Sequence, residues 1–81
     1  MIKVLFFAQT RELVGVDELE LTGEFATVEQ VRSHLVQQPG KWDLALEPGK
    51  LLAAVNQSIV PLDHAVKPGD EVAFFPPVTG G

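Results

Sequence analysis

The sequence contains no cysteine among its 81 residues, and this absence removes several classes of chemistry at once. Disulfide scaffolds, cysteine-ligated zinc sites, iron–sulfur clusters and thiol nucleophiles all require cysteine and are therefore excluded. A chain without disulfides also fits the cytoplasm, where disulfides are rare. We therefore expect a cytoplasmic protein.

Basic residues are scarce as well. Six Lys and Arg stand against eleven Asp and Glu, which gives a net charge of −5. This charge repels phosphate backbones and anionic membranes, so the sequence predicts neither nucleic acid nor a membrane as a partner. It suits a partner with a basic surface, and it equally serves to keep a small protein soluble.

Long apolar runs are missing too. The apolar run at residues 2–8 is too short for a signal peptide, and Arg11 and Glu12 follow without a small-residue cleavage site. No stretch approaches the ~20 apolar residues that cross a bilayer. We expect neither a leader nor a membrane span.

Catalytic side-chain patterns are also lacking. His34 and His64 have no carboxylates at metal-ligand spacing, so we expect two surface histidines and no metal site. Ser33 and Ser58 lack a G-x-S-x-G motif, and no phosphate loop or dinucleotide motif occurs. The sequence therefore predicts no cofactor bound by this chain, and no set of side chains that supports an autonomous enzyme.

What is present is a single small domain with 46% apolar residues, enough for a compact core. Runs of apolar residues, mostly alternating or bounded by turn residues, predict strands. They cover residues 2–8, 17–22, 51–55, 59–60 and 71–75. In the first and last strands, Phe6 and Phe74 lie on the predicted core face, whereas Phe7 and Phe75 point the other way.

One clear helix separates the strands. Thr27 is a typical N-cap and forms a capping box with Gln30; Val28 begins the apolar face, and Pro39-Gly40 ends the helix. Shorter helical turns are predicted at residues 11–15, closed by Gly15, and at 42–46, where Trp42 packs in the core or a loop. The order of elements predicts an α+β fold, with a mixed sheet on one main helix. The β-grasp, or ubiquitin-like, arrangement fits this order most simply, with the first and last strands adjacent and parallel.

The C-terminus carries the most informative chemistry. Pro76 and Pro77 end the last strand, which divides the chain into a domain at 1–75 and an extended tail at 76–81. The last four residues would reach about 13–14 Å when extended. Gly80 and Gly81 have no Cβ, so the tail can thread a narrow channel and place its carboxylate in another protein's active site. By itself, a Gly-Gly end is more typical of a frayed terminus.

Three motifs settle this ambiguity by resemblance. They lie at Val4–Gln9 followed by Arg11–Gly15, at Leu52–Gln57 and at Asp70–Gly81, and the last ends in Phe-Phe-Pro-Pro-Val-x-Gly-Gly. Over essentially its whole length, the chain resembles the small, sulfur-carrying subunits of molybdopterin synthase. This resemblance also implies the β-grasp fold.

The resemblance implies a function for the tail. An E1-like enzyme that uses ATP and Mg²⁺ is expected to adenylate Gly81, which then becomes a thiocarboxylate. Gly80 lets the tail enter the large subunit of the synthase, where sulfur passes to cyclic pyranopterin monophosphate. Any catalytic side chains are expected on that large subunit, within a heterotetramer. ATP, Mg²⁺ and zinc belong to the activating enzyme.

The facing of the first and last strands suggests a binding surface, and the resemblance supports it. Phe7 and Phe75 are expected to lie side by side on the outer sheet face, with Ile59 nearby, as an exposed patch that binds a partner. The tail residues Pro76, Pro77, Val78 and Thr79 are expected to contact the same partner. Other readings stay open: a sulfur carrier for thiamine or tRNA thiolation, a ubiquitin-like modifier that forms an isopeptide bond, or a binding module with an inert tail.

Overall fold

The structure of the chain is a computed structural model that describes residues 1–77. Its elements in chain order are β1 (Ile2–Phe6), α1 (Ala8–Val14), β2 (Glu18–Leu21), α2 (Val28–Leu35), α3 (Trp42–Ala45), a 3₁₀ turn η1 (Pro48–Lys50), β3 (Leu52–Val55), β4 (Ser58–Val60) and β5 (Glu71–Phe75). No helix within residues 1–77 is long and apolar enough to span a bilayer.

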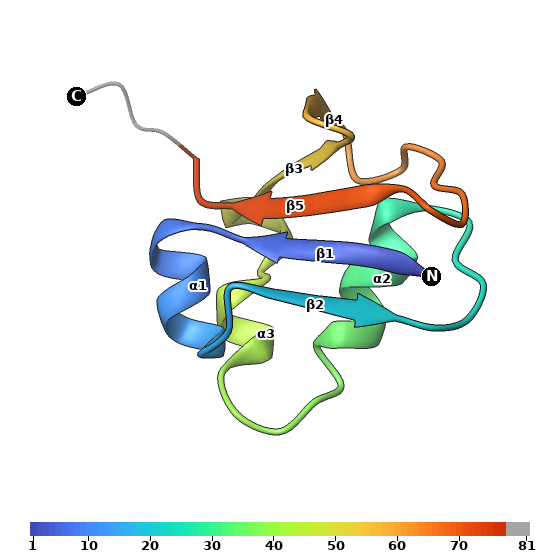
Figure 1. The fold of residues 1–81 in the computed structure, drawn as a ribbon. Helices are drawn as coiled ribbons and strands as arrows, with labels where there is room; N and C mark the ends of the chain where they lie inside the picture. The colour runs from blue at the N-terminus through green and yellow to red at the C-terminus, as the bar shows by residue number, and fades with distance from the viewer. Residues whose placement is uncertain (78–81) are drawn as a thin grey trace.

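The strands form one mixed sheet in the order β2-β1-β5-β3-β4 (Figure 1). β1 and β5 are parallel neighbours in the middle of the sheet, as the sequence predicts, and the other three pairs are antiparallel. The helices lie on one face of this sheet (Figure 1). The fold is therefore α+β, of the β-grasp type.

The core lies between the sheet and α2. From α2 it takes the side chains that the helical periodicity predicts, Val28, Val31 and Leu35, none of them exposed. Phe6 and Phe74 stack from β1 and β5 with ring centroids 6.3 Å apart. Trp42 from α3 meets Phe6 edge-on at 5.5 Å, which places it in the core, one of the two positions that the sequence left open. This packing fixes the inner face of both central strands and leaves their alternate residues on the outer face.

The capping box of α2 forms as predicted, with one shift. Thr27 Oγ1 accepts a hydrogen bond from the Gln30 N–H at 3.2 Å. The Gln30 side chain accepts from the N–H of Ala26, one residue before the cap, rather than from Thr27 itself. The helix ends at Leu35, ahead of the predicted stop at Pro39-Gly40. Bonds from Gln37 N–H to His34 and from Gln38 N–H to Leu35 tighten the chain there into turns.

The predicted strand over 2–8 is wrong at its end, because β1 stops at Phe6. Phe7 is still extended but caps α1, and Ala8 has a left-handed φ of 53° that turns the chain out of the sheet. The predicted turn at 11–15 is a full helix, closed as expected by Gly15 at φ 84°. α1 packs against α3 and the end of β5, so it lies beside the place where the C-terminal segment leaves the sheet (Figure 1).

Candidate functional site: the outer sheet face and the root of the tail

Four apolar side chains cross the middle of the outer sheet face in one row. Leu5 of β1 pairs with Ala73 of β5, Ala73 pairs with Ala54 of β3, and Ala54 pairs with Ile59 of β4. Because paired residues point to the same side of a sheet, these four side chains share the face opposite the helices. The row is apolar along its whole length.

The row forms the floor of a hollow of about 440 Å³. We call its apolar lining the outer patch. It consists of Leu5, Phe7, Ala54, Ile59, Ala73 and Phe75. Two alanines lie at its centre and larger side chains surround them, so the surface is concave. Its exposed members are chiefly Phe7, at 47%, and Ile59, at 69%. An exposed apolar hollow of this kind is typical of a surface that another protein covers.

The structure thus brings together Phe7, Ile59 and Phe75, the three residues proposed from the sequence. Their role in binding a partner stays a prediction. The sequence interpretation missed Leu5, Ala54 and Ala73. Alternation along β1 and β5 places Leu5 and Ala73 with Phe7 and Phe75, so that signal was available for two of them. The third, Ala54, belongs to a near-continuous apolar run that shows no alternation.

Charged residues border the outer patch toward β2. Leu5 pairs with Glu18 and Lys3 with Glu20, and the Lys3 ammonium lies 3.4 Å from the Glu18 carboxylate. Glu71 lines the hollow on the β5 side. Three carboxylates and one ammonium leave this border acidic, which complements a partner whose matching border is basic.

A hydrogen-bonded turn fixes the start of β5. The Asn56 side chain accepts from the Glu71 N–H at 3.0 Å and donates to Asp70 at 3.1 Å. Asp70 also accepts from the Lys67 N–H at 2.9 Å. The Lys67 bond, then the Asn56 bond, lower the pKa of the Asp70 carboxyl below its ordinary value. This clasp joins the β3–β4 turn to the start of β5, the strand whose other end carries Phe75.

Two other groups whose pKa values are shifted lie on α2. The hydrogen bond from Arg32 lowers the pKa of Glu29 and raises that of Arg32. Arg32 also donates to the Leu46 carbonyl at 3.0 Å, so the pair ties α2 to the end of α3. Both residues lie on the helical layer, away from the outer patch, and their arrangement serves packing.

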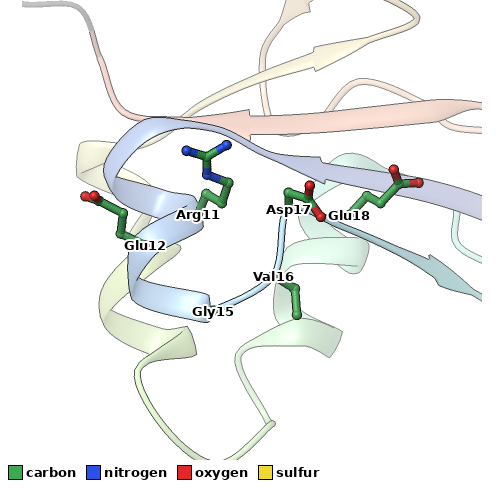
Figure 2. A pocket seen from close by; sticks show the side chains of 6 residues that line it. All are labelled: Arg11, Glu12, Gly15, Val16, Asp17 and Glu18. Atoms are coloured by element: carbon green, nitrogen blue, oxygen red, sulfur yellow. The ribbon is translucent and has the colours of Figure 1, made fainter.

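The predicted histidines lie at the surface. His34 is exposed on α2, where its ring meets Phe25 edge-on, and His64 is exposed in a loop. Among residues 1–77, no three His, Cys, Asp or Glu gather closely enough to hold a metal ion. A wide hollow between α1 and β2 contains Arg11, Asp17 and Glu18 (Figure 2). All its lining residues are exposed, so it is an open surface depression.

The outer patch leads directly to the tail. Phe75 closes β5, Pro76 is half-buried and Pro77 is exposed. The other predicted tail residues, Val78, Thr79, Gly80 and Gly81, lie outside the described residues. The two prolines lack N–H donors and cannot continue the ladder, so the strand has to end here.

Fold and site together define a ubiquitin-like β-grasp protein with an apolar outer face beside its C-terminal segment. The sequence profile described as the ThiS family matches residues 4–81. The chain belongs to this family.

Named relatives agree with this assignment. The molybdopterin synthase sulfur carrier subunit of Haemophilus influenzae is 67% identical over 81 residues, which covers both chains completely. SAMP1 of Haloferax volcanii, a small archaeal modifier protein, has a solved structure with a TM-score of 0.75; it is 27% identical and the match covers 99% and 98% of the two chains. A solved complex of subunits 1 and 2 of the molybdopterin-converting factor from Helicobacter pylori contains a chain that matches at a TM-score of 0.67, with 23% identity and coverage of 99% and 97%.

Proposed function

We propose that the chain is the sulfur carrier of molybdopterin synthase, and that Gly81 holds the sulfur. The observation that carries this proposal is the 67% identity, over both full chains, to the Haemophilus influenzae subunit of that name. The outer patch supports it, because an apolar hollow beside the tail provides a way to hold the domain while the tail enters a partner.

The proposed chemistry takes place on the terminal carboxylate. One of its oxygens attacks the α-phosphorus of ATP in the activating enzyme, and pyrophosphate leaves. A sulfur nucleophile at the oxidation level of sulfide then attacks the acyl carbon, the bond to AMP breaks, and a thiocarboxylate remains. The sulfur then attacks a carbon of cyclic pyranopterin monophosphate and replaces an oxygen substituent there. Water hydrolyses the remaining acyl–sulfur bond, which leaves the sulfur on the product and restores the carboxylate. In this scheme ATP and Mg²⁺ belong to the activating enzyme, and this chain binds no cofactor.

Two protein partners follow from the proposal. One is the E1-like adenylating enzyme, and the other is the large synthase subunit, with which the chain forms a heterotetramer. The Helicobacter pylori complex of subunits 1 and 2 supports the second partner. In the proposed heterotetramer, the domain at 1–75 docks onto the large subunit through Phe7, Ile59 and Phe75. The segment at 76–81 reaches the active site of that subunit. Gly80 leaves room for the channel wall to close on the backbone.

The intact mass of the protein tests the chemistry. After incubation with the activating enzyme, ATP and a sulfide source, the mass should rise by the difference between one sulfur and one oxygen atom. A variant with one residue added after Gly81 is the matched control, because it keeps the fold and moves the carboxylate. An unchanged mass of the wild-type chain, under conditions that modify a known carrier, contradicts the proposal.

A second function has one specific observation in its favour. The similarity to SAMP1, at 27% identity, is a similarity to a protein named as a modifier. A modifier would join Gly81 to a lysine of another protein. The same mass measurement separates the two functions, since a modifier gives covalent protein conjugates that survive thiol reagents.

A further inference from the structure

A second hollow lies at the root of the tail, on the side of the sheet that carries the helices. It has a volume of about 220 Å³ and lies between α1, α3 and the end of β5. We call it the tail-root pocket. Its apolar walls are Leu13, Leu44, Ala45 and Pro76, and two uncharged polar residues of α1, Gln9 and Thr10, complete the lining. Glu47 and Lys50 border it with one charge of each sign.

The walls of this pocket are held by the core. In the four-residue helix α3, Trp42 and Ala45 are buried, whereas Leu44 is 59% exposed. The buried pair anchors the helix and thereby sets the position of Leu44. Leu13 stands across from it on α1, half-buried against the core. The pocket is therefore preformed, with an exposed leucine at its rim.

Two consecutive residues, at the point where the chain leaves the sheet, line the two hollows. Phe75 lines the outer patch, and the next residue, Pro76, lines the tail-root pocket. A channel that encloses an extended chain has a wall on every side of it. A channel around this exit would meet Phe75 on the outer side, and Pro76 with the pocket beside it on the opposite side. The two hollows thus lie on either side of the point where the chain leaves the sheet.

We propose that one uncharged, apolar side chain from the mouth of the large subunit's channel inserts into the tail-root pocket. This inference rests on the proposed function, since it needs a partner that receives the tail. The opposite charges of Glu47 and Lys50 cancel, so the pocket is locally neutral in a chain of net charge −5 and does not attract a cationic side chain. Together with the outer patch, the contact grips the tail root from both sides.

Binding at the outer patch and binding at the tail-root pocket should depend differently on the tail. The outer patch binds the domain whether or not the tail is threaded. In the proposed complex, the side chain that enters the tail-root pocket belongs to the wall that surrounds the tail. Substitutions in the pocket should therefore weaken binding strongly in the full chain and weakly in a chain that lacks residues 78–81.

The test is calorimetric titration of the purified large subunit with Leu44→Glu and Leu44→Ala. In the full chain we expect Leu44→Glu to weaken binding about ten- to hundredfold, and Leu44→Ala about three- to tenfold. Without residues 78–81, each loss should shrink to less than about threefold. Val16→Glu is the matched control, because it adds the same charge at an apolar residue that is 40% exposed and remote from the pocket.

Phe75→Ala, measured alongside, separates the two proposals. If Phe75→Ala weakens binding and both Leu44 variants bind like wild type, the tail-root contact is wrong and the proposed function stands. If the Leu44 variants lose equal affinity in the full chain and in the chain without residues 78–81, the proposal that this contact depends on the tail is also wrong. If Phe75→Ala and the shortened chain both bind like wild type, the proposed docking to the large subunit fails as well. Melting curves establish that each variant is folded.

Discussion

Ala54 and Ala73 lie opposite each other in the β3–β5 pair, at the centre of the outer patch. Strands favour branched and aromatic side chains at such positions. Two alanines instead leave the floor low between Phe7, Phe75 and Ile59, and this pairing is what makes the face concave. The hollow is thus a direct consequence of two small residues that meet across neighbouring strands.

Filling the hollow should therefore block docking. We expect Ala73→Leu to weaken binding to the large subunit at least about tenfold, because its side chain occupies space that the partner needs. The melting temperature should not fall, since the added atoms point away from the core. Ala53→Leu is the matched control: Ala53 is 1% exposed on the inner face, where overpacking costs about 1–3 kcal/mol of stability. Normal binding by a folded Ala73→Leu protein would remove the outer patch from the interface.

Phe75 and Phe74 should respond in opposite ways to truncation. Phe75→Ala is expected to cost ~2–4 kcal/mol of binding to the large subunit, with little change in melting temperature. Phe74 is fully buried and stacks on Phe6, so Phe74→Ala should cost ~3–5 kcal/mol of folding stability. Phe7→Ala should act like Phe75→Ala, but more weakly, as it lies farther from the tail. Titration and melting curves of the three variants decide the matter; a low melting temperature for Phe75→Ala alone would mean that the last strand faces the other way.

The cap of α2 should contribute stability without affecting function. Thr27→Ala removes the side-chain acceptor for the Gln30 N–H and leaves only the Thr27 carbonyl, and losing such a cap typically costs about 1 kcal/mol. For a domain of this size the melting temperature should drop by roughly 4–8 °C. Gln37→Ala, at an exposed residue beyond the helix, serves as the control. Sulfur transfer at 25 °C should match wild type in both variants, and its loss in Thr27→Ala would indicate a role of α2 beyond the fold.

Asp70 should make the folding stability of the domain depend on pH in the acid range. The bonds from Lys67 and Asn56 lower its folded-state pKa, so its stabilising effect is complete above the ordinary pKa of an Asp. The effect is lost as the pH falls through the lowered pKa and the carboxylate becomes protonated. The Asp70→Asn variant should therefore lose less stability than wild type between about pH 5 and pH 2. Urea unfolding at a series of pH values measures this; Asp63→Asn keeps the Asp70 bonds and is the control. Parallel profiles for wild type and Asp70→Asn would contradict the role of the clasp.

Periodicity predicted the central strands and the main helix because burial there follows one simple pattern. Val28, Val31 and Leu35 recur at helical spacing, and all three are buried as expected. The β1 boundary was missed because alternation continues through Ala8, whereas the chain turns at that alanine with a left-handed φ of 53°. Periodicity carries no information about such a local turn.

The outer patch was predicted only in part for a related reason. Large exposed residues such as Phe7 and Ile59 stand out in a sequence, whereas Ala54 becomes informative only through its partners in the sheet. The tail-root pocket was not predicted at all. The pocket forms where α1, α3 and Pro76 come together. The sequence predicted only a single helical turn at 11–15, where the structure has the whole helix α1.

Sulfur transfer from the isolated thiocarboxylate form tests the central claim most directly. The thiocarboxylated chain is mixed with the large subunit and cyclic pyranopterin monophosphate, without ATP, and both the product and the mass of the chain are measured. Because a dithiolene holds two sulfur atoms and each carrier holds one, we predict that two chains return to the carboxylate mass for each molybdopterin formed. A chain that lacks Gly81 should give no product. Molybdopterin formation while the thiocarboxylate remains intact, or with the chain that lacks Gly81, would contradict the claim that Gly81 carries the sulfur.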